Sequence, residues 1–307
     1  MKKHPVAVTI RSFGLNVERH KELHETCIIK YINKTGKRLS ESELSQHLQG
    51  IEGVIAGTEP FTKNVIEFAE TLKIISRVGV GLDSVDLEAA HNHGIKVVNT
   101  PDAPVHSVAE HTVALILVLL KNFMRYTTML HDGSYGVEPG HMLSGRTVGI
   151  VGMGRIGYRV ASLLEPFGCK ITYYDPWTRK EIPKRWHSMT SLDDLLKYSD
   201  ILTLHSPPSP DGRALLDQRA FTVIKNNALI INTARGSLID ETALAKALEN
   251  GRISGAGLDV QAKEPYTGVL LDFPQVIITP HVASNTVESR QQMEIEAVNN
   301  MIKAFGG

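Results

Sequence analysis

The sequence lacks the features that define several other classes of protein. It has only two cysteines, Cys27 and Cys169, so neither a disulfide framework nor a cysteine-rich zinc site is expected. Its 33 Lys and Arg residues balance 33 Asp and Glu residues, so the basic excess typical of a nucleic-acid-binding domain is absent. The longest apolar run, residues 113–120, is far shorter than the about 20 residues that cross a bilayer. The basic start of the chain is followed by only a short apolar stretch, and no secretory signal is predicted. We therefore expect a cytoplasmic protein with no nucleic-acid or membrane partner.

Short apolar segments alternate with segments of helical periodicity. In the first hundred residues this pattern predicts helices at 41–48, 63–71 and 86–93, and strands at 6–10, 54–56, 73–76 and 95–98. Such alternation is typical of a parallel sheet covered by helices. The Pro-rich stretch 101–104 interrupts the pattern and predicts a crossover between domains.

A second run of alternation follows a long helix predicted at about 107–130, which is apolar on nearly all sides and should pack between two surfaces. Helices are predicted at 156–167, 192–198, 218–224 and 241–250, and six strands at 147–151, 171–174, 201–205, 228–232, 255–259 and 276–279. A last helix, 287–305, is expected to return to the first domain. The predicted fold is α/β, with two Rossmann-like or flavodoxin-like parallel-sheet domains. Residues 101–284 are expected to be inserted into a domain formed by residues 1–100 and 285–307.

Three glycines follow the strand predicted at 147–151 and begin the next helix. In this context Gly152 permits a tight turn, Gly154 lets the backbone approach a pyrophosphate, and Gly157 lets the helix pack closely on the strand. The helix N-terminus adds unpaired N–H groups and a partial positive charge. The pattern predicts a dinucleotide-binding loop.

Asp175 ends the next predicted strand, 18 residues after Gly157. A carboxylate at this place can accept both ribose hydroxyls and repels a 2′-phosphate, so the predicted cofactor is NAD. Arg179 and Lys180 lie just beyond it and leave NADP open as an alternative. A purely structural turn is the other alternative, but the register of strand, glycines, helix and acid favours cofactor binding.

Arg235, Glu264 and His281 each follow a later predicted strand. Ligands of an open parallel sheet bind outside the carboxyl ends of its strands, so these side chains can converge there. A histidine, with an ordinary pKa of about 6.5, suits proton exchange with a secondary alcohol. A glutamate can orient the histidine, and an arginine offers a planar fork to a carboxylate or ketone oxygen. Each residue alone also fits a structural role, but the combination favours hydride-transfer chemistry.

Further motifs extend over nearly the whole chain: RVGVGLDSVD at 77–86, NTP at 99–101, SVAE at 107–110, NTARG at 232–236, GLDV at 257–260 and TPHVAS at 279–284. With the glycine loop, they resemble the D-isomer-specific 2-hydroxyacid dehydrogenase family. Within that family the sequence is most similar to D-3-phosphoglycerate dehydrogenases. The resemblance implies an NAD-dependent oxidoreductase that acts on a CH–OH group. Hydride would pass between nicotinamide and C2 of a 2-hydroxy or 2-keto acid.

The resemblance also implies roles for individual residues. Residues 101–284 would bind NAD, and the other domain would bind substrate. His281 would be the general acid and base, Glu264 its partner, and Arg235 a ligand of the substrate carboxylate or carbonyl. The implied substrate site comprises Arg77, Val78, Gly79, Arg235 and His281, although Arg77 fits a structural ion pair equally well. The implied cofactor contacts are Val80, Gly152, Gly154, Arg155, Ile156, Gly157, Asp175, Ser206, Pro207, Thr233, Ala234 and Asp259. No metal is expected, since His91 and His93 lie two residues apart on a predicted helix and do not share a face.

Family resemblance further implies a homodimer formed through the NAD-binding domain, with the helix and arm at 107–144 in the interface. The sequence departs from many phosphoglycerate dehydrogenases in two places: residues 56–60 lack an arginine suited to a phosphate, and the arm at 133–137 lacks a tryptophan and a basic cluster. One nucleotide domain is present, so a short form without a regulatory domain is expected.

A hydroxypyruvate or glyoxylate reductase, or another D-2-hydroxyacid dehydrogenase, stays open as an alternative function. A non-catalytic NAD(H)-sensing scaffold is the alternative from another class. Glu264 argues against formate oxidation, because formate-oxidising relatives carry Gln there.

Overall fold

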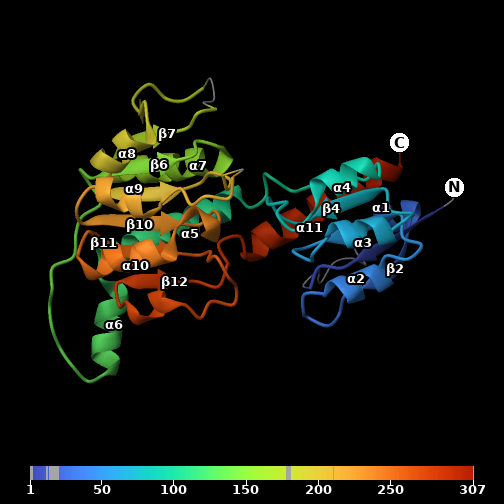
Figure 1. The fold of residues 1–307 in the computed structure, drawn as a ribbon, viewed down its shortest axis with the longest axis horizontal. Helices are drawn as coiled ribbons and strands as arrows, with labels where there is room; N and C mark the ends of the chain where they lie inside the picture. Colours follow the sequence, from blue (N-terminus) through green and yellow to red (C-terminus); the bar gives the residue numbers. More distant parts are fainter. Residues whose placement is uncertain (1–2, 12, 14–20, 178–180, 210, 307) are drawn as a thin grey trace. The chain divides into compact units, whose positions relative to one another are not determined.

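The chain is described by a computed structural model that places residues 3–11, 13, 21–177, 181–209 and 211–306. It divides into two compact units. Unit 1 comprises Met1–Pro104 and Thr286–Gly307, and unit 2 comprises Val105–Asn285. Each unit is an α/β structure with its own parallel sheet, of five strands in unit 1 and seven in unit 2 (Figure 1). The predicted fold class is therefore confirmed.

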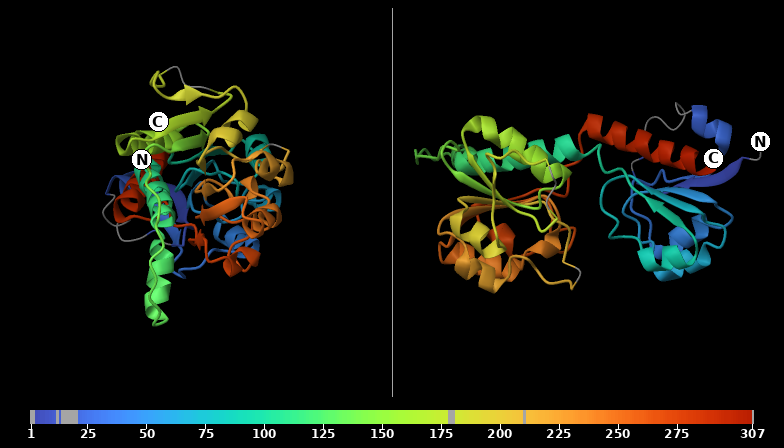
Figure 2. Two further views of the ribbon diagram at one scale, coloured as in Figure 1. Left: turned by 90° about the vertical axis from the view of Figure 1, so that its left-hand side faces the viewer. Right: turned by 90° about the horizontal axis from the view of Figure 1, so that it is seen from above.

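The sheet of unit 1 has the strand order β2-β1-β3-β4-β5, which is the flavodoxin-like order. Its strands are β1 (His4–Val8), β2 (Cys27–Ile32), β3 (Gly53–Ala56), β4 (Ile74–Arg77) and β5 (Lys96–Val98). Its helices are α1 (Lys21–Thr26), α2 (Glu41–His47), α3 (Lys63–Phe68), α4 (Leu87–Asn92) and α11 (Val287–Phe305). Helices α2, α3 and α4 contribute to one apolar core, and α11 to a second core on the other face of the sheet (Figure 2).

Unit 2 has the strand order β12-β11-β10-β9-β6-β7-β8, a doubly wound sheet whose order reverses between β6 and β9. Its strands are β6 (Thr147–Val151), β7 (Lys170–Tyr174), β8 (His187–Ser188), β9 (Ile201–Leu204), β10 (Ala228–Asn232), β11 (Ile253–Leu258) and β12 (Val276–Ile278). Helices α5 (Val105–Leu120) and α7 (Arg155–Leu164) cover one face. Helices α8 (Leu192–Tyr198), α9 (Gln218–Val223) and α10 (Glu241–Glu249) cover the other (Figure 2).

Buried apolar strands explain why both sheets need helices on both faces. Every residue of β3, β9 and β10 is buried, as expected for central parallel strands. Side-chain caps fix where several covering helices begin: Asp240 accepts from the Ala243 N–H at α10, and Thr286 from the Ser289 N–H at α11. Both helices therefore begin at a defined residue after the loops that follow β10 and β12.

Four elements differ from the sequence-based expectations. Helix α1 and strand β2 were not predicted, because α1 runs into β2 at Thr26–Cys27 with no turn residue between them. Strand β8 was also missed, since it has two exposed residues and no apolar pattern, and unit 2 has seven strands instead of six. The single helix expected at 107–130 is wrong. It breaks into α5 and α6 (Phe123–His131), because Asn122 adopts a left-handed conformation with φ of 55°.

The break also bears on membrane insertion. Within the described ranges, no single helix is long and apolar enough to cross a bilayer. The pair α5 and α6 has the length and composition together, but is bent by 60°. Helix α5 is packed into a core of unit 2, which accounts for its apolar character.

Candidate active site

The loops that follow β6, β9, β10, β11 and β12 lie at one edge of the unit 2 sheet. In an open parallel sheet this carboxyl edge forms the ligand site, centred where the strand order reverses. That reversal lies between β6 and β9, so the glycine loop after β6 and the segment after β9 are direct neighbours. Most of the predicted site residues of unit 2 belong to these loops.

The glycine loop has the close approaches that its sequence predicts. Gly152 has φ of 89°, and a Cβ on it would lie 2.8 Å from backbone atoms of His205 and Ser206. A Cβ on Gly157 would lie 2.0 Å from the Gly152 carbonyl oxygen, so only glycine lets α7 pack this closely. By contrast, a Cβ on Gly154, the N-cap of α7, would meet nothing within 4 Å. Open space at this N-cap suits a pyrophosphate.

Asp175 joins the glycine loop to the turn after β7. Its Oδ2 accepts from the Met153 N–H at 2.6 Å, and its Oδ1 accepts from the Trp177 N–H at 2.7 Å. The carboxylate is thereby fixed beside the loop, where a ribose would follow the pyrophosphate. Arg179 and Lys180, on which the NADP alternative depended, lie outside the described residues.

The segment after β9 contains a buried polar atom without a partner. Ser206 Oγ is buried and has no hydrogen-bond partner within the described structure. A bound polar ligand would satisfy it, so the residues present fit a dinucleotide. Beside it, burial lowers the pKa of His205 to about 3, and its ring lies 2.9 Å from Thr203 Oγ1. Of the other expected contacts, Pro207 is exposed, and Arg155 and Ile156 form the first turn of α7.

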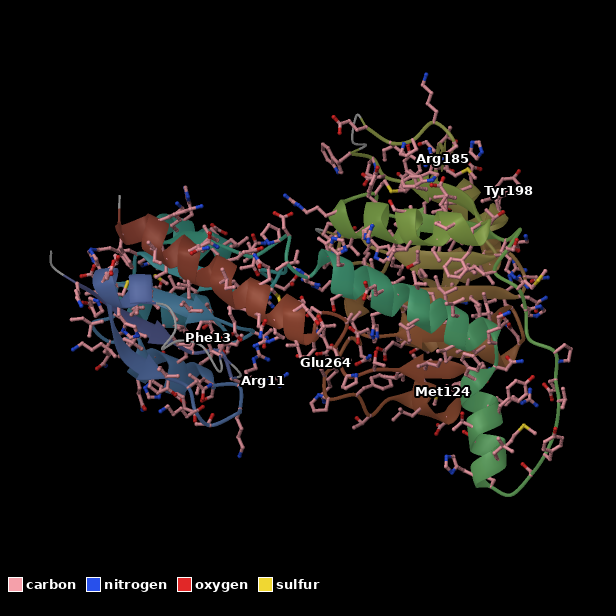
Figure 3. The ribbon with its side chains drawn as sticks, turned by 180° about the vertical axis from the view of Figure 1, so that it is seen from behind. Arg11, Phe13, Met124, Arg185, Tyr198 and Glu264 are labelled. Carbon is pink, nitrogen blue, oxygen red and sulfur yellow. The ribbon has the colours of Figure 1, made fainter. Side chains whose placement is uncertain are left out.

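His281 and Glu264 lie within hydrogen-bond distance although 17 residues separate them. His281 Nδ1 is 3.1 Å from Glu264 Oε1 and 3.2 Å from Oε2. Both side chains are partly exposed, and Figure 3 labels Glu264 in its loop. A carboxylate at Nδ1 holds that nitrogen as the N–H donor, which leaves Nε2 to take up or release a proton. The pair thus has the arrangement of an oriented acid and base.

Asp259 organises the loop that carries His281. It is fully buried, and its carboxylate accepts from Thr279 Oγ1 at 2.6 Å and from the Val282 and Ala283 N–H groups at 2.8 Å each. Its carbonyl oxygen accepts from the His281 N–H at 2.8 Å. His281 has φ of 55°, a left-handed conformation that a histidine rarely adopts, and these bonds hold it there.

The loop after β10 is fixed from both sides. Asn232 donates from Nδ2 to the Arg235 carbonyl at 2.8 Å and accepts from the Ala234 N–H at 3.0 Å. Gly236 packs so tightly that a Cβ would lie 1.9 Å from the Gln261 carbonyl carbon. The half-buried Arg235 donates from Nη1 to the Ala234 carbonyl. The Arg235 side chain thus extends from a rigid loop that follows β10, the strand next to β11.

The remaining predicted residues belong to unit 1 and lie where β4 ends. Arg77 Nη1 donates to the Val78 carbonyl at 2.6 Å and covers Gly79, on which a Cβ would lie 1.4 Å from that nitrogen. The Val78 N–H donates to the Ala56 carbonyl, and the Gly79 N–H donates to Thr100 Oγ1 at 2.7 Å. The carbonyl of the exposed Val80 accepts from Asn99. A carboxylate at Gly79 would therefore compete with the Thr100 hydroxyl.

Several residues that support this site had no role in the sequence-based prediction. On α5, His111 contacts Thr279, and Thr112 Oγ1 lies 3.0 Å from Thr233 Oγ1. A signal was present, since polar residues interrupt an otherwise apolar helix, but nothing in the sequence indicated which loops they contact.

Comparisons with known proteins identify relatives of similar sequence and fold. The family described as "D-isomer specific 2-hydroxyacid dehydrogenase, NAD binding domain" matches residues 113–283. The hydroxypyruvate reductase of Thermotoga maritima is 36% identical over 280 residues, which cover 89% of this chain and 90% of that protein. The D-3-phosphoglycerate dehydrogenase of Methanocaldococcus jannaschii is 39% identical over 281 residues, 88% of this chain and 53% of that protein. The chain thus spans about half the length of that relative. The crystal structure of D-lactate dehydrogenase from Aquifex aeolicus, complexed with NAD and lactic acid, covers 98% of this chain and 95% of its own, with 29% identity and a TM-score of 0.85.

Proposed function

We propose, since this chain belongs to the D-isomer-specific 2-hydroxyacid dehydrogenase family and carries that family's NAD-binding domain, that it is an NAD-dependent D-2-hydroxyacid dehydrogenase. The observation that carries the proposal is the His281–Glu264 pair on the sheet edge that also holds the glycine loop. A dinucleotide site alone would fit many oxidoreductases. An oriented acid and base beside it is what the interconversion of an alcohol and a ketone requires.

The chain's own residues handle the proton. During oxidation, His281 Nε2 takes the hydroxyl proton of the 2-hydroxy acid, and the adjacent Glu264 carboxylate stabilises the imidazolium that forms. During reduction, the same nitrogen returns the proton to the developing alkoxide. Because Asp259 fixes the backbone of His281, this exchange needs no rearrangement of the loop.

Cofactor binding is assigned to residues with fitting geometry. The N–H groups at the start of α7 would hold the pyrophosphate, and Asp175 would accept the ribose hydroxyls. Ser206 Oγ would gain a partner from the ligand. The remaining predicted cofactor contacts are Val80, Pro207, Thr233, Ala234 and Asp259. We keep the first four, because the Asp259 carboxylate is buried and accepts from Thr279, Val282 and Ala283. When bound, NAD supplies the hydride acceptor, and NADH the donor.

Arg235 is assigned to the substrate. Its planar guanidinium can hold the carboxylate or polarise the C2 oxygen through paired N–H donors. In unit 1, we assign Arg77 and the backbone of Val78 and Gly79 to substrate binding, as the family resemblance implies. The Gly79 N–H would then donate to the ligand and lose its hydrogen bond to Thr100 Oγ1.

Two substrate classes are supported by different observations. The resemblance to D-3-phosphoglycerate dehydrogenases favours a phosphorylated 2-hydroxy acid, with Arg77 assigned to the anionic substrate. Hydroxypyruvate or a similar small keto acid is the second candidate, favoured by the match over 90% of a hydroxypyruvate reductase. The absence of arginine from residues 56–60 also favours it.

Oxidation of NADH by the purified protein tests the proposal and separates the two classes. The keto acids to compare are 3-phosphohydroxypyruvate, hydroxypyruvate, glyoxylate, pyruvate and a branched 2-keto acid. A strong preference for the phosphorylated substrate supports the first class, and a preference for a small unphosphorylated acid supports the second. Tight NADH binding with no turnover of any of them would contradict an enzymatic role and favour the NAD(H)-sensing scaffold.

Replacing His281 tests the catalytic assignment. We expect His281→Gln to lower kcat by about 100- to 10,000-fold, the usual effect of losing one positioned proton donor. NADH affinity, measured by fluorescence titration, should stay close to that of the original protein, because the dinucleotide contacts are elsewhere. His187→Gln, on the exposed strand β8, serves as the control. Full turnover by His281→Gln would refute the assignment.

We also propose that the protein forms a homodimer through unit 2. Helix α6 has no buried residue, and Phe123, Met124 and Leu130 are each more than half exposed on it (Figure 3 labels Met124). A groove of about 740 Å³ lies beside it, lined by residues of α5, α6 and β12. A protruding apolar element next to an apolar groove is self-complementary, so a second copy related by a two-fold axis can cover both.

Light scattering after size-exclusion chromatography tests the dimer. We expect a mass of twice 33.8 kDa for the protein and a shift toward monomer for Leu130→Glu. The control is Phe68→Glu, which places the same charge on an exposed aromatic of unit 1 and should leave the dimer intact. A monomeric starting protein, or two variants that behave alike, would contradict this interface.

A further inference from the structure

We propose that Ser107 and His111 of α5 are positioning residues that hold both ends of the loop carrying His281. The inference rests on the proposed function and adds residues to which the family resemblance gave no role in the active site. Ser107 Oγ donates to the Ala283 carbonyl at 2.6 Å, and His111 Nε2 lies 3.2 Å from Thr279 Oγ1. The loop from Thr279 to Ala283 is thus attached to α5 on either side of His281.

Helical geometry explains why these two residues act together. Ser107 and His111 are four residues apart, so they lie on the same face of α5, one turn from each other. Ser107 is buried, and His111 is about one quarter exposed. The core of unit 2 that includes Leu115, Ile116 and Leu120 fixes α5 itself. A rigid helix therefore presents two polar groups at the spacing of the loop ends.

The hydrogen bonds also determine the tautomer of His111. The single hydroxyl proton of Thr279 is donated to Asp259 Oδ1, 2.6 Å away, because an ionised carboxylate can only accept. Thr279 Oγ1 must then accept from His111, so Nε2 carries the proton in the neutral ring. His111 Nε2 is also 3.6 Å from Asp259 Oδ1. These hydrogen bonds are thus donated in one direction, from His111 to Thr279 and from Thr279 to the buried Asp259 carboxylate.

Asp259, which accepts from Thr279, also restrains the backbone of His281. Its carboxylate accepts from the Val282 and Ala283 N–H groups, and its carbonyl accepts from the His281 N–H. These bonds keep His281 in its left-handed conformation, which a histidine leaves readily when unsupported. Loss of either attachment to α5 would let the loop relax and displace the imidazole from the substrate.

The loop of Arg235 is attached to the same helix. Thr112 Oγ1 donates to the Val108 carbonyl at 2.8 Å, so it must accept from the Thr233 hydroxyl, 3.0 Å away. Adjacent residues of α5 thus contact the two loops that carry the proposed proton-transfer and substrate residues. This supports α5 as the element that fixes both loops.

Kinetics of Ser107→Ala, His111→Leu and His111→Gln test the proposal. We expect the first two variants to lose about 10- to 100-fold in kcat, the effect of a small misplacement of a reacting group. His111→Gln should recover much of this loss, because its amide N–H can replace Nε2–H. NADH affinity should be unchanged, since no dinucleotide contact is removed. The control is Ser162→Ala, which removes a hydroxyl that donates within α7 and should leave kcat unchanged.

A spectroscopic measurement adds a readout independent of turnover. Nitrogen-15 NMR of histidine-labelled protein should show neutral His111 protonated at Nε2, with the resonance assigned by its loss in His111→Leu. A proton at Nδ1 would overturn the proposal, as would equal kinetic losses in the Gln and Leu variants or a matching loss of NADH affinity. Failure of the proposed function is distinguishable, since it would appear as no turnover of any keto acid by the original protein, whatever the tautomer of His111.

Discussion

Replacing Asp259 by Asn tests how the catalytic loop is held, because it keeps the size of a buried side chain but removes its charge and one of its two acceptor oxygens. The carboxylate accepts two bonds at Oδ1, from Thr279 Oγ1 and the Val282 N–H, and one at Oδ2, from the Ala283 N–H. An Asn side chain has one oxygen and one NH₂ group. Whichever way it is oriented, its NH₂ faces at least one backbone donor.

The less costly orientation places the NH₂ group against the Ala283 N–H. The variant then loses one hydrogen bond to a charged group and leaves a donor buried without an acceptor. Together these effects should lower the free energy of unfolding by about 2–5 kcal/mol. The bonds to Thr279 and Val282 are kept, so the damage should centre on Ala283 and extend to its neighbour His281.

Equilibrium urea denaturation followed by circular dichroism measures the loss in stability, and amide hydrogen exchange locates it. Exchange at the Ala283 N–H should accelerate more than exchange at the Val282 N–H. The matched control is Asp240→Asn, where the exposed carboxylate only caps α10 and Asn caps equally well. A loss below about 0.5 kcal/mol for Asp259→Asn, the range of ordinary surface changes, would refute the reasoning.

Three further predictions concern other parts of the chain. Gly152→Ala should strongly weaken NADH binding in a fluorescence titration, because φ is 89° and the new Cβ would lie 2.8 Å from the backbone of the β9 loop; unchanged affinity would contradict the loop geometry. Burial raises the pKa of Glu59 despite its bond from the Gly57 N–H and the charges of Arg77 and Arg38, so its ionised form opposes folding. Glu59→Gln should therefore raise Tm at pH 8, and the gain should disappear as pH falls below the ordinary glutamate range, where both states are protonated; thermal melts at both pH values check this. Burial lowers the pKa of His205 to about 3, so the unfolded chain binds the extra proton and the fold loses stability as pH falls below about 6.5. His205→Gln should flatten that loss between pH 6.5 and 5, and an unchanged slope in urea denaturation would show that another group is responsible.

Much of the fold could be predicted from the sequence where local pattern and tertiary structure agree. The buried strands β9 and β10 are apolar except for Thr203 and Asn232, and α11 was predicted with the bounds that the structure has. Prediction failed where an element was too short to show an apolar pattern, or where one helical pattern continued across a break. Strand β8 has two exposed residues, and the left-handed Asn122 that divides α5 from α6 lies in a sequence that reads as one helix.

The candidate site also combines features that could be predicted from the sequence with features that could not. The glycine spacing, the acid after β7 and the polar residues after the later strands are local features, and the chemistry of each side chain is evident from its type. Their hydrogen-bond partners are not local. His281 and Glu264 lie 17 residues apart, and Ser107 and Ala283 lie 176 apart. Hydrogen bonds between such distant residues leave no periodic pattern in the sequence.

The fold class, the predicted dinucleotide loop and the types of acid, base and cation available follow from the sequence alone. They depend on apolar periodicity and glycine placement, which act over a few residues. The hydrogen bonds from the His281 loop to the buried carboxylate of Asp259, and the contacts of α5 with both loops, became evident in the folded protein. The physical reason is that a parallel sheet brings the ends of distant strands together, and hydrogen bonds between those ends depend on packing and not on order along the chain.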